Sequence, residues 1–127
     1  MYMPTTTNNL KKTTKNKMKI LVIEPFQVPR VKEIEKTLEA MQKVVGDFFQ
    51  VIYPFDDSIA LIYNEEGKSL GLLPNRALRD ESGEIYDIVC GTFFLCSAPP
   101  DEENFSSLSN EQIKYFTKLY QHPELFL

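Results

Sequence analysis

The sequence is poor in the residues that build metal and nucleophile sites. Its 127 residues include no tryptophan, one histidine and two cysteines. The single histidine, His122, and the two cysteines give no zinc-ligand spacing and no Ser–His–Asp arrangement. Neither a GxxxxGK phosphate loop nor a GxGxxG dinucleotide motif occurs. We therefore expect a protein that is not an enzyme and that holds no metal and no cofactor.

Long hydrophobic runs and bridging cysteine pairs are also missing. No apolar run approaches the roughly 18 residues that a membrane span needs, and the N-terminus has no stretch that could act as a secretory signal. Cys90 and Cys96 lie in one apolar run, where strand geometry would separate them by about 20 Å, too far for a disulfide. The sequence predicts buried, reduced thiols, a cytoplasmic location and no membrane partner.

Positive charge is concentrated at the start of the chain. Residues 1–19 contain no acid and five lysines, which are Lys11, Lys12, Lys15, Lys17 and Lys19. The remainder of the chain carries a net charge of −9, within a total of −4. Residues 1–17 have almost nothing to bury, so we expect a disordered basic tail there. Residues 18–127 are expected to form a single α+β domain.

The division of charge limits the partners that we expect. The tail is either a solubilising leader or a basic arm that contacts nucleic acid. The acidic domain would repel phosphates, so nucleic acid is not expected as a partner except through the tail. The same acidity leaves room for a basic protein partner.

Periodicity predicts an α+β fold with a mostly antiparallel sheet packed against one long helix and one C-terminal helix. The long helix is expected over residues 31–45, because apolar residues recur there at spacings of three and four, and Gly46 would cap it. Leu38 lies in the middle of this stripe and is expected to be fully buried. The C-terminal helix should begin at a capping box made by Ser109 and Gln112 and place Leu119 on its buried face.

Short apolar runs between these helices predict the strands. We expect strands at residues 19–25, 47–53, 59–63, 69–73, 85–89 and 91–96. The third and fourth of these would form a hairpin around the turn at residues 64–68. Gly91 indicates a bulge or a close approach of two backbone segments.

Four polar residues are the candidate binding site. Asn64 and Glu65 open the expected hairpin tip, and Asn75 and Arg76 follow its returning strand. One reading is an internal polar network in which Arg76 bridges Glu65 or Glu84. The other is a site for a ligand or a partner, because the guanidinium fork suits carboxylate and phosphate. The carboxylate pairs Asp56–Asp57 and Glu65–Glu66 are expected to be solvated turn residues.

The segment YPFDDSIALIYNEEGKSLGLLPNRALRDESGEIYDIVCGTFF resembles the domain of unknown function 3846 family. The opening MKILVIEP is also similar to the start of that family, and the resemblance extends over about residues 18–120. The matching positions are Asn64, Glu65, Gly67, Gly71, Asn75, Arg76, Asp80, Asp87 and Gly91. The resemblance implies that the protein comes from a phage, plasmid or conjugative element of anaerobic Gram-positive bacteria. Such proteins are encoded among small accessory genes, which include genes for antirestriction proteins. It implies no catalytic residues.

Two functions remain open at this point. The first is a non-catalytic accessory binding protein of a phage or mobile element, acting on a host protein such as a defence factor. The alternative is a protein that binds or sequesters a small, nucleotide-like ligand. Its polar contacts would come from Arg76, Asn75 and Asn64. Its stacking contacts would come from Tyr63, Phe55 or Phe93.

Overall fold

A computed structural model of the chain describes residues 16–56 and 58–126. It contains seven strands and two helices within these ranges. In chain order they are β1 (Lys17–Ile23), β2 (Arg30–Glu35), α2 (Leu38–Val45), β3 (Phe49–Ile52), β4 (Ile59–Asn64), β5 (Pro74–Arg79), β6 (Ile85–Cys90), β7 (Phe93–Ser97) and α3 (Asn110–Leu119). Most of the expected basic tail lies outside the described residues, but Lys17 belongs to β1, so the domain begins one residue earlier than expected.

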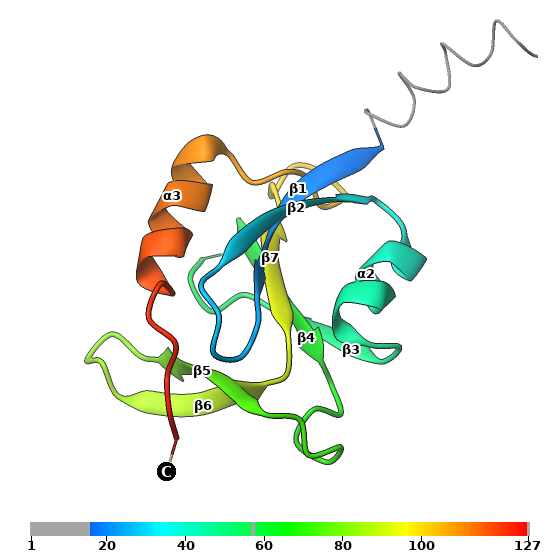
Figure 1. Cartoon of the computed structure of the whole chain (residues 1–127). Helices are drawn as coiled ribbons and strands as arrows, with labels where there is room; N and C mark the ends of the chain where they lie inside the picture. The colour runs from blue at the N-terminus through cyan, green and yellow to red at the C-terminus, as the bar shows by residue number, and fades with distance from the viewer. Residues whose placement is uncertain (1–15, 57, 127) are drawn as a thin grey trace, which may run out of the picture.

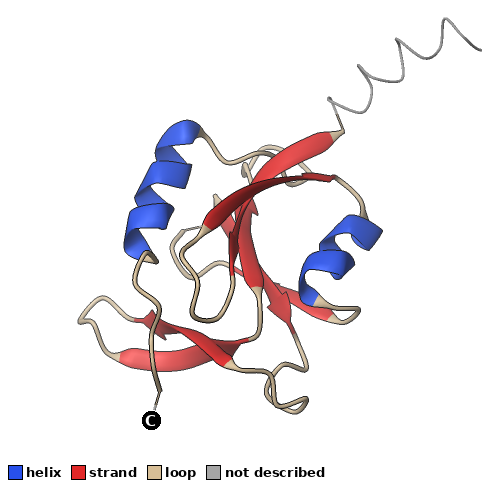
Figure 2. Ribbon diagram, in the orientation of Figure 1, coloured by secondary structure: helices blue, strands red, loops and turns tan. Residues whose placement is uncertain are grey.

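The strands form two antiparallel sheets (Figure 1). Five of them make one sheet in the order β2-β1-β7-β4-β3, and β5 and β6 make a separate two-stranded ribbon. Figure 2 shows α2 and α3 on opposite sides of the large sheet, with the ribbon below α3. This arrangement confirms the α+β class and the mostly antiparallel sheet. No helix within the described ranges has the length and apolar character needed to cross a bilayer.

Both faces of the large sheet are buried, and they form two separate cores. On one face, α3 and the ribbon cover a core that contains Leu21, Ile23, Leu61, Phe93, Leu95, Phe116 and Tyr120. On the other face, α2 covers a core that contains Met18, Ile20, Val22, Ile62, Phe94 and Cys96. Because successive side chains of a strand point to opposite faces, both cores draw on the same three central strands, β1, β7 and β4. This explains why these strands read as nearly continuous apolar runs.

The predicted helix over residues 31–45 is wrong in its first half. Residues Arg30–Glu35 form strand β2, which pairs with all but the last residue of β1. The helix α2 begins only at Leu38, where the Thr37 side chain caps it by accepting from the Ala40 amide at 3.1 Å. Hydrogen bonding to β1 outweighs the local helical pattern, because pairing between distant segments overrides propensity. Gly46 ends the helix as expected.

The shortened helix changes the environment of Leu38. It stands at the first position of α2 and is 54% exposed, not buried. Val45, at the other end of the helix, is buried in the core, and Ala40, Met41 and Val44 pack against it partly buried. In the C-terminal helix the expected capping box is present, with Ser109 and Gln112 each bonded to the other's backbone. Leu119 is exposed rather than facing the sheet.

The strand expected at residues 69–73 is a series of turns, and the strand follows at Pro74–Arg79. Strand β4 therefore pairs with β3 and β7 instead of forming a hairpin with the segment after it. Gly91, with φ of +88°, separates β6 from β7. A Cβ atom at this position would lie 2.7 Å from a side-chain methyl carbon of Leu72. The Gly91 amide donates to the Leu73 carbonyl at 2.8 Å, which is a close approach of two backbone segments as expected. Cys90 and Cys96 consequently lie on different strands, and both are free.

The revised place of Leu38 gives a direct prediction. Leu38→Ala should change the free energy of unfolding by no more than about 0.5 kcal/mol, as is usual for exposed positions. Ile62→Ala, which empties a fully buried position on β4, should cost about 2–5 kcal/mol. Chemical denaturation of both variants measures the difference. A loss above 2 kcal/mol for Leu38→Ala would show that the first turn of α2 packs on the core after all.

Candidate functional site

Two of the four predicted site residues, Asn75 and Arg76, are buried in β5. The guanidinium of Arg76 has no exposed surface and is surrounded by oxygen acceptors. Its Nη2 donates to the carbonyl of Gln27 at 2.7 Å and to that of Tyr120 at 2.8 Å. Nε donates to the same Tyr120 oxygen at 3.3 Å, and Nη1 donates to Oδ1 of Asn75 at 2.8 Å. Arg76 thus joins the β1–β2 loop to the end of α3.

The amide of Asn75 extends this network to two further segments. Its Nδ2 donates to the carbonyl of Ile23 at 2.8 Å and to that of Gly91 at 2.9 Å, while its oxygen accepts from Arg76. Asn75 therefore uses both its donor and its acceptor groups inside the protein. We call Asn75 and Arg76 with these bonds the Asn75–Arg76 clamp.

Three backbone acceptors of the clamp stand where regular structure stops, whereas Gln27 lies within the β1–β2 loop. Ile23 is the last residue of β1, Tyr120 follows the last residue of α3, and Gly91 follows the last residue of β6. Carbonyls at such ends have no partner in their own element, and a buried carbonyl without a partner costs about 1–3 kcal/mol. The clamp satisfies these groups with side-chain donors.

The charge of Arg76 is balanced without a directly paired carboxylate. Neither Glu65 nor Glu84, the partners expected from the sequence, bonds to it, and no acid within the described ranges forms a salt bridge with it. Burial lowers the pKa of the guanidinium, and the nearby Glu124 carboxylate partly offsets this effect. The Tyr120 carbonyl lies at the negative end of the α3 dipole, which further favours a cation there.

The clamp holds the loop between β1 and β2 in a restricted shape. Phe26 in this loop has a positive φ of 65°, the only described residue other than glycine to do so. Its side chain is 48% exposed, and that of Val28 is 63% exposed. A hydrogen-bonded ion pair between Glu24 and Arg30 closes the base of the loop at 3.1 Å. The loop is therefore fixed from within while its apolar side chains face outward.

The other two predicted residues, Asn64 and Glu65, lie elsewhere. Asn64 is buried at the end of β4, where its Oδ1 accepts from the Glu66 amide at 2.7 Å. Glu65 is exposed. Within the described ranges no hydrogen bond joins this pair to the clamp, so the predicted four-residue set divides into two separate sites.

Gly67 packs the turn after β4 closely against the end of β6. A Cβ atom there would lie 2.6 Å from the carbonyl oxygen of Cys90, so only glycine fits without displacement. The turn borders a cleft of about 140 Å³ whose polar lining includes Asn64, Glu65, Lys68 and Asp87. The hydrogen bond from Lys68 lowers the pKa of Asp87. Within this cleft, Lys68 and Asp87 thus compensate each other.

Carboxylates do not converge into a metal site within residues 16–56 and 58–126, where no group of three or more His, Cys, Asp or Glu side chains has suitable geometry. Asp56 accepts from the amide and hydroxyl of Ser58, and these bonds lower its pKa. Its neighbour Asp57 lies outside the described residues.

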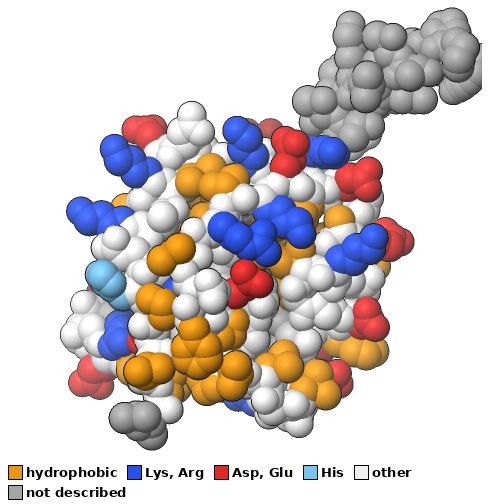
Figure 3. All heavy atoms as spheres, in the orientation of Figure 1, with side chains coloured by type: hydrophobic (Ala, Val, Ile, Leu, Met, Phe, Trp, Pro, Cys, Tyr) orange, Lys and Arg blue, Asp and Glu red, His pale blue; other side chains and the backbone are white. Residues whose placement is uncertain are grey.

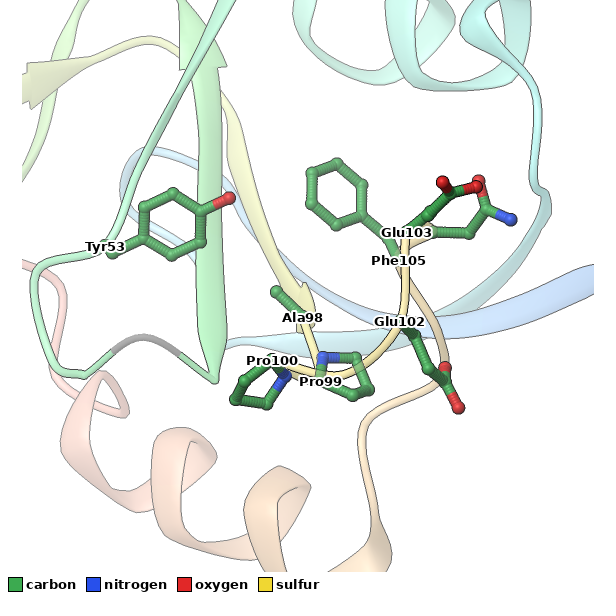
Figure 4. A pocket seen from close by; sticks show the side chains of 8 residues that line it. Tyr53, Ala98, Pro99, Pro100, Glu102, Glu103 and Phe105 are labelled. Atoms are coloured by element: carbon green, nitrogen blue, oxygen red, sulfur yellow. The ribbon is translucent and has the colours of Figure 1, made fainter.

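Several larger hollows lie on the surface, among them two beside exposed aromatic side chains. One, of about 370 Å³, separates α3 from the β5–β6 ribbon, and its lining includes Phe55, Arg79, Tyr115, Leu119 and Glu124. The other, of about 310 Å³, lies between Tyr53 and the loop that follows β7, as Figure 4 shows. No local sequence signal indicates either hollow, because each is formed by segments distant in the chain.

The buried clamp predicts a large effect of truncating Arg76. Arg76→Ala would leave the carbonyls of Gln27 and Tyr120 and the oxygen of Asn75 without a donor, so we expect a loss above about 3 kcal/mol. Arg76→Lys keeps the charge but loses the fork, and should fall between this variant and the wild type. Denaturant unfolding provides the measurement.

Arg79→Ala is the matched control for this prediction. Arg79 lies on the same strand and pairs with Glu124 at 2.9 Å, but its side chain is half exposed. An exposed pair of this kind contributes about 0–1 kcal/mol. Equal losses for Arg76→Ala and Arg79→Ala would contradict a structural role for the clamp.

No curated protein and no solved structure matches this chain. The family described as "Domain of unknown function (DUF3846)" matches residues 18–121, from the second residue of β1 to just past the end of α3. The match spans both cores and every residue of the clamp. The resemblance noted in the sequence is therefore confirmed over most of the chain, and the protein belongs to the DUF3846 family.

Proposed function

We propose that this protein is a non-catalytic binding protein that acts on another protein through the apolar surface around its β1–β2 loop. The observation that supports the proposal is Phe26, an exposed aromatic side chain on a backbone of positive φ. Such a conformation costs a residue other than glycine about 1–3 kcal/mol and persists only where the surroundings impose it. The Asn75–Arg76 clamp supplies that constraint through the Gln27 carbonyl.

A fixed aromatic side chain is well suited to bind a protein. Aromatic residues are enriched among the side chains that dominate interface energies, and a loop already held in its bound shape loses little conformational entropy on binding. A purely structural Phe26 would instead be expected to cover its ring in the core. The positions of the clamp and of Phe26 together favour a contact surface.

Neighbouring segments extend this surface. Figure 3 shows hydrophobic side chains gathered on the lower part of this face, around the β1–β2 loop and the C-terminal segment. The exposed apolar residues on these and adjoining segments are Phe26, Val28, Leu73 and Leu125. The Glu24–Arg30 ion pair lies beside the loop and supplies a polar border, as is usual around the apolar centre of an interface.

The choice of partner class rests on charge and on family. The net charge of −9 beyond residue 19 favours a basic partner. The family resemblance implies a phage, plasmid or conjugative element as the setting, and hence a host protein, such as a defence factor, as the target.

Phe26→Asn provides the sharpest test. Asparagine tolerates positive φ better than phenylalanine, so we expect an unchanged or slightly higher melting temperature together with lost binding. The full chain is immobilised and exposed to lysate of a bacterium that carries such an element, and the captured proteins are quantified. Loss of a central aromatic contact costs about 2 kcal/mol or more, which is about 30-fold in affinity.

Leu38→Asn is the matched control, because Leu38 is equally exposed but lies on α2. A protein captured by the wild type and by Leu38→Asn, but lost with Phe26→Asn, supports the proposal. Identical sets of captured proteins for all three would contradict it, and so would a marked fall in the melting temperature of Phe26→Asn.

A small ligand in the hollow between α3 and the ribbon is the second candidate. Phe55 and Tyr115 offer aromatic surface there, and Arg79 offers a cation. The polar contacts suggested by the sequence are not available, since Asn75 and Arg76 are buried and bonded within the protein. A hollow of about 370 Å³ lies at the small end of the usual range for ligand pockets.

A thermal-shift screen against nucleotides tests this alternative. A ligand present at 100 times its dissociation constant should stabilise the protein by about 2.7 kcal/mol. Tyr115→Ala, at a position on the exposed side of α3, should abolish the shift without lowering the melting temperature of the free protein. The absence of a shift with every nucleotide would exclude this class of ligand.

A further inference from the structure

The two outer strands of the large sheet differ in how their free edges are protected. Four of the six residues of β2 are charged, namely Arg30, Lys32, Glu33 and Glu35. Charges of this kind discourage the pairing of an edge strand with another chain. The opposite edge strand, β3, has the sequence FQVI, and neither it nor the flanking Phe48 and Tyr53 carries charge. The protein thus protects one edge and leaves the other open.

The register of β3 shows which of its backbone groups are free. The Glu65 amide donates to the Phe48 carbonyl at 2.8 Å, so alternate residues from position 48 onward bond to β4. The N–H and C=O groups of Phe49, Val51 and Tyr53 therefore point away from the sheet. β3 pairs with β4 alone among the described strands, which leaves these groups available to another strand.

We propose that the protein forms a two-fold symmetric dimer in which β3 pairs antiparallel with β3 of a second copy, with Val51 opposite Val51. In this register Phe49 of each copy lies opposite Tyr53 of the other. All three outward-facing residues then exchange both backbone hydrogen bonds with their counterparts. The two five-stranded sheets become one continuous sheet across the axis.

Three features favour a second copy over a foreign strand. The register places an aromatic residue opposite an aromatic residue on the same face of the sheet, a pairing that stabilises antiparallel strands. It also covers Tyr53, which is half exposed at the mouth of the hollow in Figure 4. Finally, the edge from Phe48 to Tyr53 has no acidic residue with which a basic foreign strand could pair, whereas an uncharged edge matches its own copy.

Cross-linking tests the register. A hydrogen-bonded antiparallel pair separates its Cα atoms by about 5.5 Å, which is within the range of a disulfide. In the full chain with Cys90→Ser, Val51→Cys should form a cross-linked dimer under mild oxidation. Cys96 does not interfere, because burial raises the pKa of its thiol to about 12. Val31→Cys, at an exposed position on β2 outside the proposed interface, is the control and should form no cross-linked dimer. Equal cross-linking of the two variants, or none at position 51, would overturn the proposal.

Sedimentation equilibrium of the wild type over about two decades of concentration tests the association itself. We expect a monomer–dimer equilibrium that tightens as salt is added, because salt screens the repulsion between two acidic domains.

Tyr53→Asp should weaken the dimer by about tenfold or more, since it places a charge opposite Phe49. Val51→Pro should abolish the dimer, because proline removes an N–H that bonds across the proposed interface. This N–H faces away from β4, so the hydrogen bonds between β3 and β4 remain. A wild type that is monomeric at every concentration would overturn the proposal. A wild type that stays monomeric and pairs only with strands of other proteins would overturn it too.

Discussion

The bonds from the Arg76 guanidinium to backbone carbonyls connect parts of the fold that no single element connects. Gln27 lies in the loop after β1, and Tyr120 lies at the end of α3. Through Asn75, the same network reaches the ends of β1 and β6. Three of the acceptors, Ile23, Gly91 and Tyr120, stand where an element stops and where the carbonyl would otherwise be buried without a partner. The positions of these connecting segments thus depend on the Arg76 side chain, which is not part of either hydrophobic core.

This constraint also explains how a two-stranded ribbon persists beside a five-stranded sheet. A ribbon of two strands is marginally stable by itself. β5 and β6 place Leu78 and Val89 in the core beneath α3, and the clamp fixes β5 to the loop and to the helix end. Among the described residues, the opposite face of the sheet has no comparable buried polar network and is covered by α2, which has only eight residues, with Ala98 and Phe105. The two sides of one sheet are therefore held by different physical means.

The sequence predicts those parts of the fold whose signals are local. The strand around Ile20 and the capping box at Ser109 are read correctly, because apolar continuity and side-chain capping act within a few residues. The strand at Arg30–Glu35 is missed, since its apolar spacing also fits a helix and its partner, β1, is recognised only in three dimensions. At the candidate site, the sequence identifies Arg76 and Asn75 but not their acceptors. Every residue has a backbone carbonyl, so the sequence does not show which carbonyls accept from a given side chain. It therefore could not decide whether Arg76 and Asn75 form a ligand site or an internal network.

The separation of the clamp's partners along the chain has a consequence for biosynthesis. Arg76 and Tyr120 are 44 residues apart, and Asn75 and Ile23 are 52 residues apart. Contacts of such long range form late in folding. On the ribosome, β5 emerges well before the end of α3, and until residue 120 has followed, the cation of Arg76 lacks the oxygen that accepts two of its bonds. The nascent chain must therefore keep this side chain hydrated, and the ribbon undocked, until synthesis of α3 is complete.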